Sequence, residues 1–252
     1  MGFDACTAPS AATMNTWWMS SPYFWAGVYI GGINRACSNP NLSASWVSTV
    51  AGQGWGLVPI WVGNQAPCGG YAHPISNDQA TAYRQGIDSA INAMNTAFGL
   101  GFGIGTVIYL DIESYSSSSN QTCRNAVDAY VNGWSFQIKQ NYSSKAGAYG
   151  SSCGSFVVDW AALAHVPTDV FPAHWNGVHS VWNLCGLPNA AWVGDRRLHQ
   201  YAANQNQTYG GTTLFVDSSC GLGHAAAGSV ALDESDAPGV NESNGPSEDP
   251  SC

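Results

Sequence analysis

Two carboxylates stand two residues apart at the end of an apolar run, in the stretch Gly-Thr-Val-Ile-Tyr-Leu-Asp-Ile-Glu-Ser-Tyr of residues 105–115. If this run is a β-strand, Asp111 and Glu113 point to the same face, with their bases roughly 6–7 Å apart. Like charges at this range, partly removed from water, raise the pKa of one carboxyl group. A protonated acid beside an ionised carboxylate is suited to cleaving glycosidic bonds, because the acid protonates the leaving oxygen and the carboxylate stabilises positive charge on the sugar.

Two further acids end apolar runs in the same way. Asp4 ends Gly-Phe-Asp near the start of the chain, and Asp217 directly follows Leu-Phe-Val, residues 214–216. Four of the ten acids in residues 1–232 therefore lie at predicted strand ends, and Glu113 is the only glutamate before residue 233. For any one of these acids a turn or solvated loop is the better explanation, but the four together favour a catalytic site.

The elements that must position these acids alternate between strand and helix. Strands are predicted at 2–6, 24–32, 55–63, 105–113, 145–152, 169–177, 196–202 and 212–219, and helices at 41–54, 76–99, 120–140 and 153–166. The strands are apolar throughout, which is typical of a parallel sheet buried on both faces. We therefore predict one α/β domain over residues 1–232, a TIM-like (β/α)8 barrel whose site lies at the carboxyl ends of its strands.

An open, doubly wound sheet is the alternative fold. Its nucleotide fingerprint is absent, because the glycine-rich residues 99–105 precede a strand instead of joining a strand to a helix. The last twenty residues, 233–252, hold six acids and no base, and we interpret them as an acidic disordered tail or linker.

Aromatic residues lie near the same predicted strand ends. Their faces can stack on sugar rings and their polar tips can bond hydroxyl groups, although core packing explains any single ring as well. The aromatic candidates are Tyr29, Trp61, Tyr149, Trp175, Trp182 and Tyr201, and Gln200, beside Tyr201, is a further candidate for substrate binding.

Charge excludes several classes of partner. The net charge of −9 falls to −3 for residues 1–232, with seven bases against ten acids, so no basic face for nucleic acid is expected. No apolar stretch is long enough to span a membrane. Because Met1 is followed at once by Gly-Phe-Asp, without the apolar segment of a signal peptide, we interpret the chain as a mature domain, expected to be monomeric.

Eight cysteines, none in a Cys-x-x-Cys pair or at zinc-ligand spacing, indicate disulfides and an oxidising compartment. We expect them to brace the loops around the barrel mouth, with the pairing left open. Asn-x-Ser/Thr sequons at Asn41, Asn120, Asn141, Asn206 and Asn241 agree with a secreted glycoprotein. No metal site and no cofactor are expected, since the six histidines form no metal-binding motif.

These motifs carry a resemblance to a known family. Gly-Phe-Asp-Ala-Cys, Tyr-Leu-Asp-Ile-Glu, His-Gln-Tyr-Ala and Phe-Val-Asp-Ser-Ser resemble the family 25 glycoside hydrolases, the Chalaropsis-type lysozymes, over about residues 1–220. The opening residues 2–17 are still more similar to a related group of secreted proteins described as glycoside-hydrolase-like, whose function is mostly unassigned.

The resemblance implies a role for each acid and a substrate. Glu113 would be the general acid/base and Asp111 its carboxylate neighbour, with Asp4 and Asp217 completing an acidic floor. Tyr149 matches an aromatic residue of the substrate groove. The implied substrate is peptidoglycan, cut between N-acetylmuramic acid and N-acetylglucosamine with retention, the substrate N-acetyl group being the proposed nucleophile.

The chain also departs from that family. The family's Trp-Gln-Tyr appears here as His199, Gln200 and Tyr201, and the cysteines are more numerous. We interpret the chain as a secreted hydrolase of a cell-wall polysaccharide, with peptidoglycan as the favoured substrate. The alternatives are another microbial wall polysaccharide, a glycan-binding barrel without catalysis, and a polysaccharide deacetylase, for which the sequence offers no metal ligands.

Overall fold

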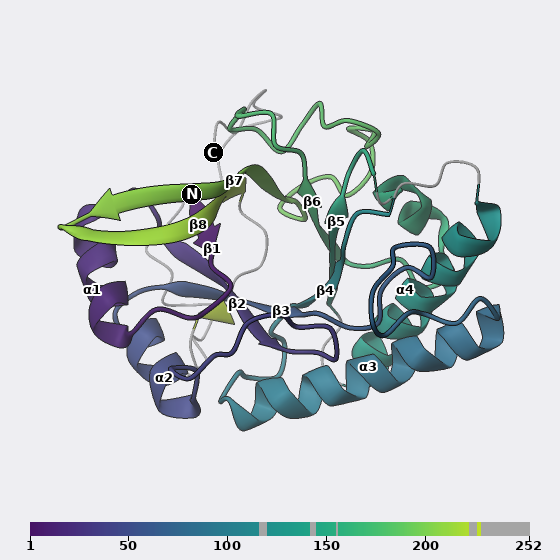
Figure 1. Cartoon of the computed structure of the whole chain (residues 1–252), viewed down its shortest axis with the longest axis horizontal. Helices are drawn as coiled ribbons and strands as arrows, with labels where there is room; N and C mark the ends of the chain where they lie inside the picture. Colours follow the sequence, from purple (N-terminus) through teal and green to yellow (C-terminus); the bar gives the residue numbers. More distant parts are fainter. Residues whose placement is uncertain (116–119, 142–144, 155, 222–225, 228–252) are drawn as a thin grey trace.

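The computed structural model of the chain describes residues 1–115, 120–141, 145–154, 156–221 and 226–227. Eight strands close into a barrel, because β2 pairs with both β1 and β3 and β8 pairs with both β1 and β7 (Figure 1). The strands are β1 (Gly2–Asp4), β2 (Trp25–Gly31), β3 (Gly56–Trp61), β4 (Ile108–Ile112), β5 (Ala146–Ser151), β6 (Asp169–Ala173), β7 (Leu198–Tyr209) and β8 (Thr212–Gly221). A short β9 (Ala226–Ala227) pairs with the start of β3. The barrel and its single domain agree with the sequence prediction.

The last strand departs from the predicted (β/α)8 arrangement. Strands β1 to β7 run parallel, but β8 is antiparallel to both β7 and β1. A parallel crossover needs a dozen or more residues, whereas only Gly210 and Gly211 separate β7 from β8. Both glycines have positive φ, 56° and 78°, which suits a tight hairpin turn. The hairpin extends beyond the barrel over the first helix (Figure 1), where Trp17 Nε1 donates to the carbonyl oxygen of Thr212 at 3.0 Å.

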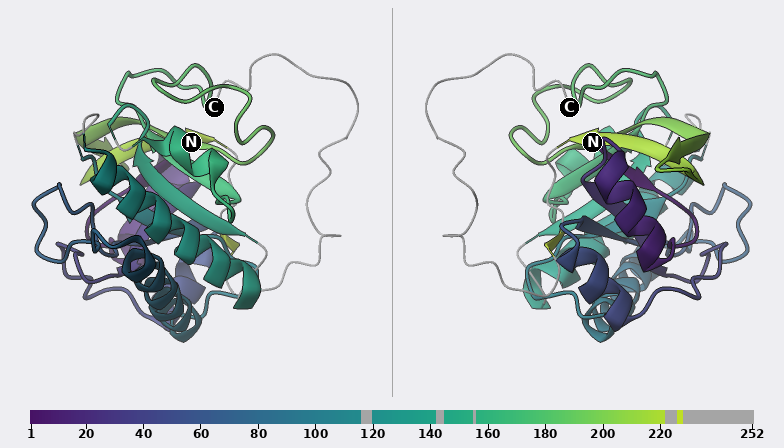
Figure 2. Two further views of the ribbon diagram at one scale, coloured as in Figure 1. Left: turned by 90° about the vertical axis from the view of Figure 1, so that its right-hand side faces the viewer. Right: turned by 90° about the vertical axis from the view of Figure 1, so that its left-hand side faces the viewer.

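The helices lie on the outside of the barrel (Figure 2). They are α1 (Ala11–Ser20), α2 (Ala44–Gly52), α3 (Gln79–Gly99) and α4 (Gln121–Asn141), followed by the short 3₁₀ helix η1 (Val157–Ala162). Helix α1, which Ser10 caps, was not predicted from the sequence, and η1 stands where a longer helix was predicted. No helix occurs among residues 174–197, which join β6 to β7. Neither α3 nor α4, nor any other helix in the described residues, is long and apolar enough to cross a membrane.

Strands β1 to β6 are buried along most of their length, as their apolar sequences predict, because two cores flank the sheet. One core fills the barrel and the other lies between the barrel and the helices. Inside the barrel the ring of Phe171 contacts those of Trp25, Tyr109 and Tyr149, with centroids 5.2–6.0 Å apart. These rings close the barrel beneath its polar mouth.

Three disulfides join loops at the carboxyl ends of the parallel strands. Cys6 after β1 bonds Cys37 after β2, Cys68 after β3 bonds Cys123 in the first turn of α4, and Cys153 after β5 bonds Cys185 before β7. The prediction that cysteines brace the loops around the mouth is confirmed for these three pairs. The predicted acidic tail, residues 233–252, lies outside the described residues.

Candidate active site

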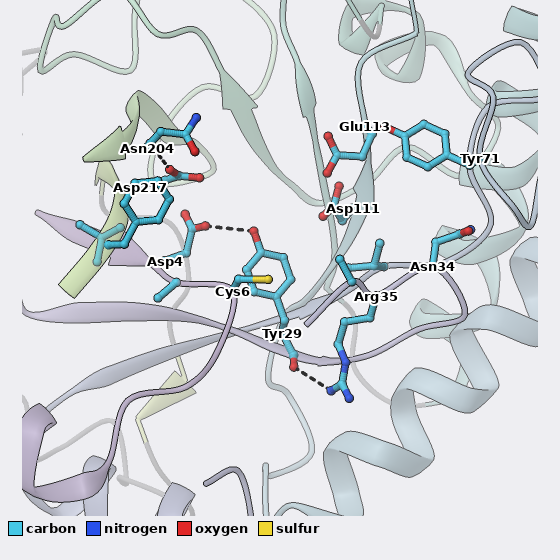
Figure 3. A pocket seen from close by; sticks show the side chains of 15 residues that line it. Asp4, Cys6, Tyr29, Asn34, Arg35, Tyr71, Asp111, Glu113, Asn204 and Asp217 are labelled. Atoms are coloured by element: carbon cyan, nitrogen blue, oxygen red, sulfur yellow. Dashed lines mark hydrogen bonds between the residues drawn. The ribbon is translucent and has the colours of Figure 1, made fainter. Parts of the chain in front are cut away.

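Four carboxyl groups converge on one pocket of about 300 Å³ at the barrel mouth (Figure 3). Asp111 and Glu113 come from the end of β4 and share a face, as strand alternation predicts. Asp4 and Asp217 lie on the opposite side of the pocket. The pocket therefore gathers all four acids that the sequence singled out.

Asp217 reaches this pocket by a route that the sequence analysis did not foresee. It was expected to end the last strand, but β8 continues to Gly221. Because β8 is antiparallel to β1, Asp217 pairs directly with Asp4, the last residue of β1. A mid-strand residue of the hairpin thus lies beside the carboxyl end of a parallel strand.

Gln200 on β7 organises the Asp4 side of the pocket. Its amide nitrogen donates to Asp4 Oδ2 at 2.9 Å, and its amide oxygen accepts hydrogen bonds from the Tyr149 hydroxyl at 2.9 Å and from Trp175 Nε1 at 3.0 Å. Tyr29 donates to the other oxygen of Asp4 at 3.0 Å. These contacts fix the orientation of the Asp4 carboxyl group.

Gln65, which the sequence analysis missed, holds the backbone of the Asp-x-Glu segment. Its buried side chain donates to the carbonyl oxygen of Asp111 and accepts from the Glu113 amide, both at 2.8 Å. Gln65 therefore continues the hydrogen bonding of β4 beyond the last regular strand residue. No pattern in the sequence marks it, since it lies in the loop after β3.

Burial and like charge disturb the ionisation of the β4 pair. Asp111 is buried, and its Oδ1 has no hydrogen-bond partner within the described part of the chain. Desolvation, followed by repulsion from Glu113 and Asp4, raises the Asp111 pKa well above its usual value. The pKa of half-buried Glu113 is also raised, first by burial and then by the charge of Asp217.

Hydrogen bonds partly oppose the raised pKa values of the other two acids, Asp4 and Asp217. Burial and the neighbouring Asp217 raise the pKa of Asp4 to about 7, although its bonds from Gln200 and Tyr29 oppose the shift. Burial raises the pKa of Asp217 as well, but the Asn204 amide donates to its Oδ1 at 2.6 Å and stabilises the ionised form. Negative charge is therefore best accommodated on half-exposed Asp217, and protons on Asp4, Asp111 and Glu113.

Arg35 is the one Lys, Arg or His side chain among the described residues that line this pocket. Arg35 lines the rim, but its guanidinium donates to the carbonyl oxygen of Tyr29 at 3.3 Å and points away from the carboxyl groups (Figure 3). The described residues also contain no cluster of three or more His, Cys, Asp or Glu side chains that could hold a metal ion.

A smaller pocket of about 190 Å³ adjoins the first, and Glu113 lines both. Its other walls include Tyr149, Ser151, His174 and the largely exposed ring of Trp175. Glu113 therefore stands between a strongly acidic pocket and an aromatic one.

Three of the predicted sugar-binding aromatics lie elsewhere. Trp61 packs in the core between the barrel and the helices. The ring of Trp182 covers the Arg197 guanidinium at 4.6 Å, and the ring of Tyr201 packs against His179 at 4.2 Å. None of the three lines either mouth pocket, whereas Tyr71 and Asn204, which were not predicted, line the larger one.

Comparison with solved structures identifies the same fold in three bacterial proteins. The Tat-secreted protein Rv2525c of Mycobacterium tuberculosis, crystallised with L-tartrate, superposes with a TM-score of 0.58 at 17% identity, covering 85% of this chain and 91% of its own. An uncharacterized protein of B. stearothermophilus has a TM-score of 0.58 at 14% identity, covering 87% of this chain and 94% of its own.

The modular autolysin LytC of Streptococcus pneumoniae is similar over a shorter part of its length. Its TM-score is 0.52 at 14% identity, covering 86% of this chain and 45% of LytC. A search of curated proteins found no match. Residues 15–220 match the sequence profile of the Rv2525c-like, glycoside hydrolase-like domain. The chain therefore belongs to the Rv2525c-like family of glycoside hydrolase-like domains.

Proposed function

We propose that this protein is a glycoside hydrolase of cell-wall polysaccharide, with peptidoglycan as its substrate and Glu113 as its general acid. The observation that carries the proposal is the position of Glu113, a half-buried carboxyl group whose pKa is raised, at the edge of a pocket with three further acids. Such a group retains its proton to a higher pH than an ordinary glutamate and can donate it to a leaving oxygen.

The two pockets beside Glu113 suggest how a glycan is held. The sugar that develops positive charge occupies the acidic pocket, where the Asp217 carboxylate stabilises that charge. The leaving sugar occupies the smaller pocket and stacks on Trp175. Glu113 lines both pockets, so its proton reaches the oxygen between the two sugars. Once that bond has broken, the Glu113 carboxylate takes a proton from the incoming water.

The comparisons support this proposal. The family is described as glycoside hydrolase-like, and LytC, which has the same fold, is an autolysin. Three disulfides are typical of an oxidising compartment, and Rv2525c is a secreted protein, so we infer that this protein acts outside the cell.

Release of reducing ends from purified peptidoglycan tests the proposal, with the products identified by mass. We expect release by the wild type and a loss of at least about 100-fold in Glu113→Gln, because the change keeps the shape and removes the proton donor. Asp88→Asn, at an exposed site on α3, is the matched control and should retain full activity.

Near wild-type activity of Glu113→Gln would show that another group donates the proton. Binding of peptidoglycan by the wild type without release of reducing ends would instead support a glycan-binding barrel. Release from other microbial wall polysaccharides, but not from peptidoglycan, would keep the reaction and change the substrate.

A further inference from the structure

A third pocket lies on the outside of the barrel, away from the four acids. It has a volume of about 440 Å³ and lies between the start of α3, the first half of α4 and the residue after η1. Helices α3 and α4 run side by side there (Figure 2). The lining residues are Gln79, Ala80, Tyr83, Asn125, Asp128, Ala129, Asn132 and Leu163.

Three polar residues form a row along α4 within this pocket. Asn125, Asp128 and Asn132 are spaced by three and four residues, so they share one face and span about 10 Å of helix. The amide oxygen of Asn125 accepts a hydrogen bond from Gln121 at 2.7 Å, and that of Asn132 accepts one from the His165 amide at 2.8 Å. Each asparagine therefore has its NH₂ group to offer to a ligand.

Asp128 lies between the two asparagines, but the nearby Arg124 pairs with Asp159 instead. The Arg124 guanidinium donates twice to Asp159 Oδ2, at 3.0 and 2.6 Å. Asp128 Oδ1 is buried and has no hydrogen-bond partner among the described residues. An unmatched buried oxygen costs about 1–3 kcal/mol, and more when the group is charged, so this environment favours the protonated form of Asp128. Burial and Asp159 also raise the Asp128 pKa to about 7, which favours a carboxyl group that can both donate and accept.

The opposite wall, on α3, is held rigidly against α4. A Cβ atom added to Gly133 would lie 2.0 Å from the carbonyl oxygen of Tyr83, and one added to Gly86 would lie 2.1 Å from that of Tyr130. This close approach fixes the Tyr83 backbone relative to the polar row. The Tyr83 ring also packs on Phe136, with centroids 6.2 Å apart. Little conformational entropy would be lost when a ligand binds between such walls.

We propose that this outer pocket is a second glycan-binding site, which holds a neutral stretch of polysaccharide outside the catalytic barrel. The lining contains one aromatic ring, two asparagines, a glutamine, a single carboxyl group and no Lys, Arg or His. An aromatic face suits the apolar face of a sugar, and the amide and carboxyl groups suit its hydroxyl and N-acetyl groups. The site goes beyond the proposed hydrolase activity and does not require it.

Titration of Glu113→Gln protein with a tetramer of N-acetylglucosamine tests the outer site, because this variant should not cleave the probe. We expect the side-chain amide NMR signals of Asn125 and Asn132 to move. Ala80→Arg places a long charged side chain at the pocket from an exposed position and should weaken these shifts by about tenfold or more. Asn95→Arg, exposed further along α3, is the control and should leave them unchanged.

The indole signal of Trp175 reports on the catalytic pocket in the same titration, so the two sites are read separately. If Asn125 and Asn132 shift while the wild type releases no reducing ends from any glycan, the outer site stands and the proposed hydrolase fails. If their signals stay fixed at millimolar probe, or if Ala80→Arg responds like Asn95→Arg, the outer site is wrong whatever the activity.

Discussion

The parallel strands and the β7–β8 hairpin contribute to the acidic pocket in opposite ways. Strand β4 delivers Asp111 and Glu113 from its end, above the closed aromatic core, and burial is the largest cause of their raised pKa values. Strand β8 delivers Asp217 from its middle, where the side chain is half exposed and accepts a hydrogen bond from the Asn204 amide of the same hairpin. The parallel part of the barrel thus favours protons, and the hairpin favours charge.

This division explains how one pocket can keep an acid protonated beside a carboxylate. The charge that raises the pKa of Glu113 comes from Asp217, across the pocket, and not from Asp111, its neighbour on the strand. Asp111 is the more buried of the β4 pair, and Glu113 raises the pKa of Asp111 instead. From the sequence, the charged role was assigned to Asp111, because spacing along a strand indicates which residues are close but not how deeply each is buried.

Separate replacement of Asp217 and Asp111 tests this difference between the hairpin and the parallel strands most strongly. Glu113 must be protonated to act, so activity declines as the pH rises through its pKa. Asp217→Asn removes the charge that raises this pKa, and the alkaline limb of kcat/KM should move to lower pH by about one unit. Asp111→Asn replaces a protonated carboxyl group with a neutral amide, so this limb should stay in place. The measurement is the pH dependence of reducing-end release for both variants.

The comparison of the alkaline limbs of the two variants decides between the two assignments. An alkaline limb that moves in Asp111→Asn and stays fixed in Asp217→Asn would reverse the division and restore the assignment made from the sequence. Circular dichroism of both variants at the pH extremes would separate a shift in the Glu113 pKa from unfolding.

The parallel strands of the barrel were predicted well from the sequence. Strand alternation placed Asp111 and Glu113 on one face, and the apolar runs predicted a closed, doubly covered sheet. The hairpin was not foreseen, because a run such as that of residues 212–219 carries no sign of its direction. Asp217 was therefore placed correctly at the mouth for an incorrect reason, since strand direction depends on pairing partners that lie far away in the sequence.

The same apolar runs hide which face of a strand points inward. Trp61 was expected at the site, but Val58 and Ile60 take the inner positions of β3, so Trp61 faces the helices. A strand that is apolar on both faces gives no signal to choose between them. Gln65 was missed because its role depends on the backbone of β4, which only the folded barrel brings near.

Asp4, which joins β1 to the hairpin, should make stability depend on pH. Its folded pKa of about 7 exceeds the usual aspartate value of 3.8, so the folded state binds the proton more tightly. The free energy of unfolding should therefore fall as the pH rises from about 4 to about 7, by up to roughly 4 kcal/mol from this residue. Asp4→Asn should flatten that slope, as measured by urea denaturation across this range, even if the lost hydrogen bond lowers overall stability. Asp88→Asn, exposed on α3, should keep the wild-type slope, and an unchanged slope in Asp4→Asn would contradict the assignment.

Alanine substitutions at Gly210 and Gly211 in the hairpin turn should have the smallest effect on stability. They test how the hairpin is anchored. Both have positive φ, so an alanine at either position should cost about 1 kcal/mol of unfolding free energy. A Cβ atom at Gly211 would meet no atom within 4 Å, whereas one at Gly210 would lie 2.6 Å from Thr16 Cγ2 on α1. Gly210→Ala should therefore be the more destabilising change in urea, by about 1 kcal/mol or more beyond Gly211→Ala. Equal losses would show that the hairpin tip does not need its contact with α1, and that pairing with β1 is enough to hold Asp217 in the pocket.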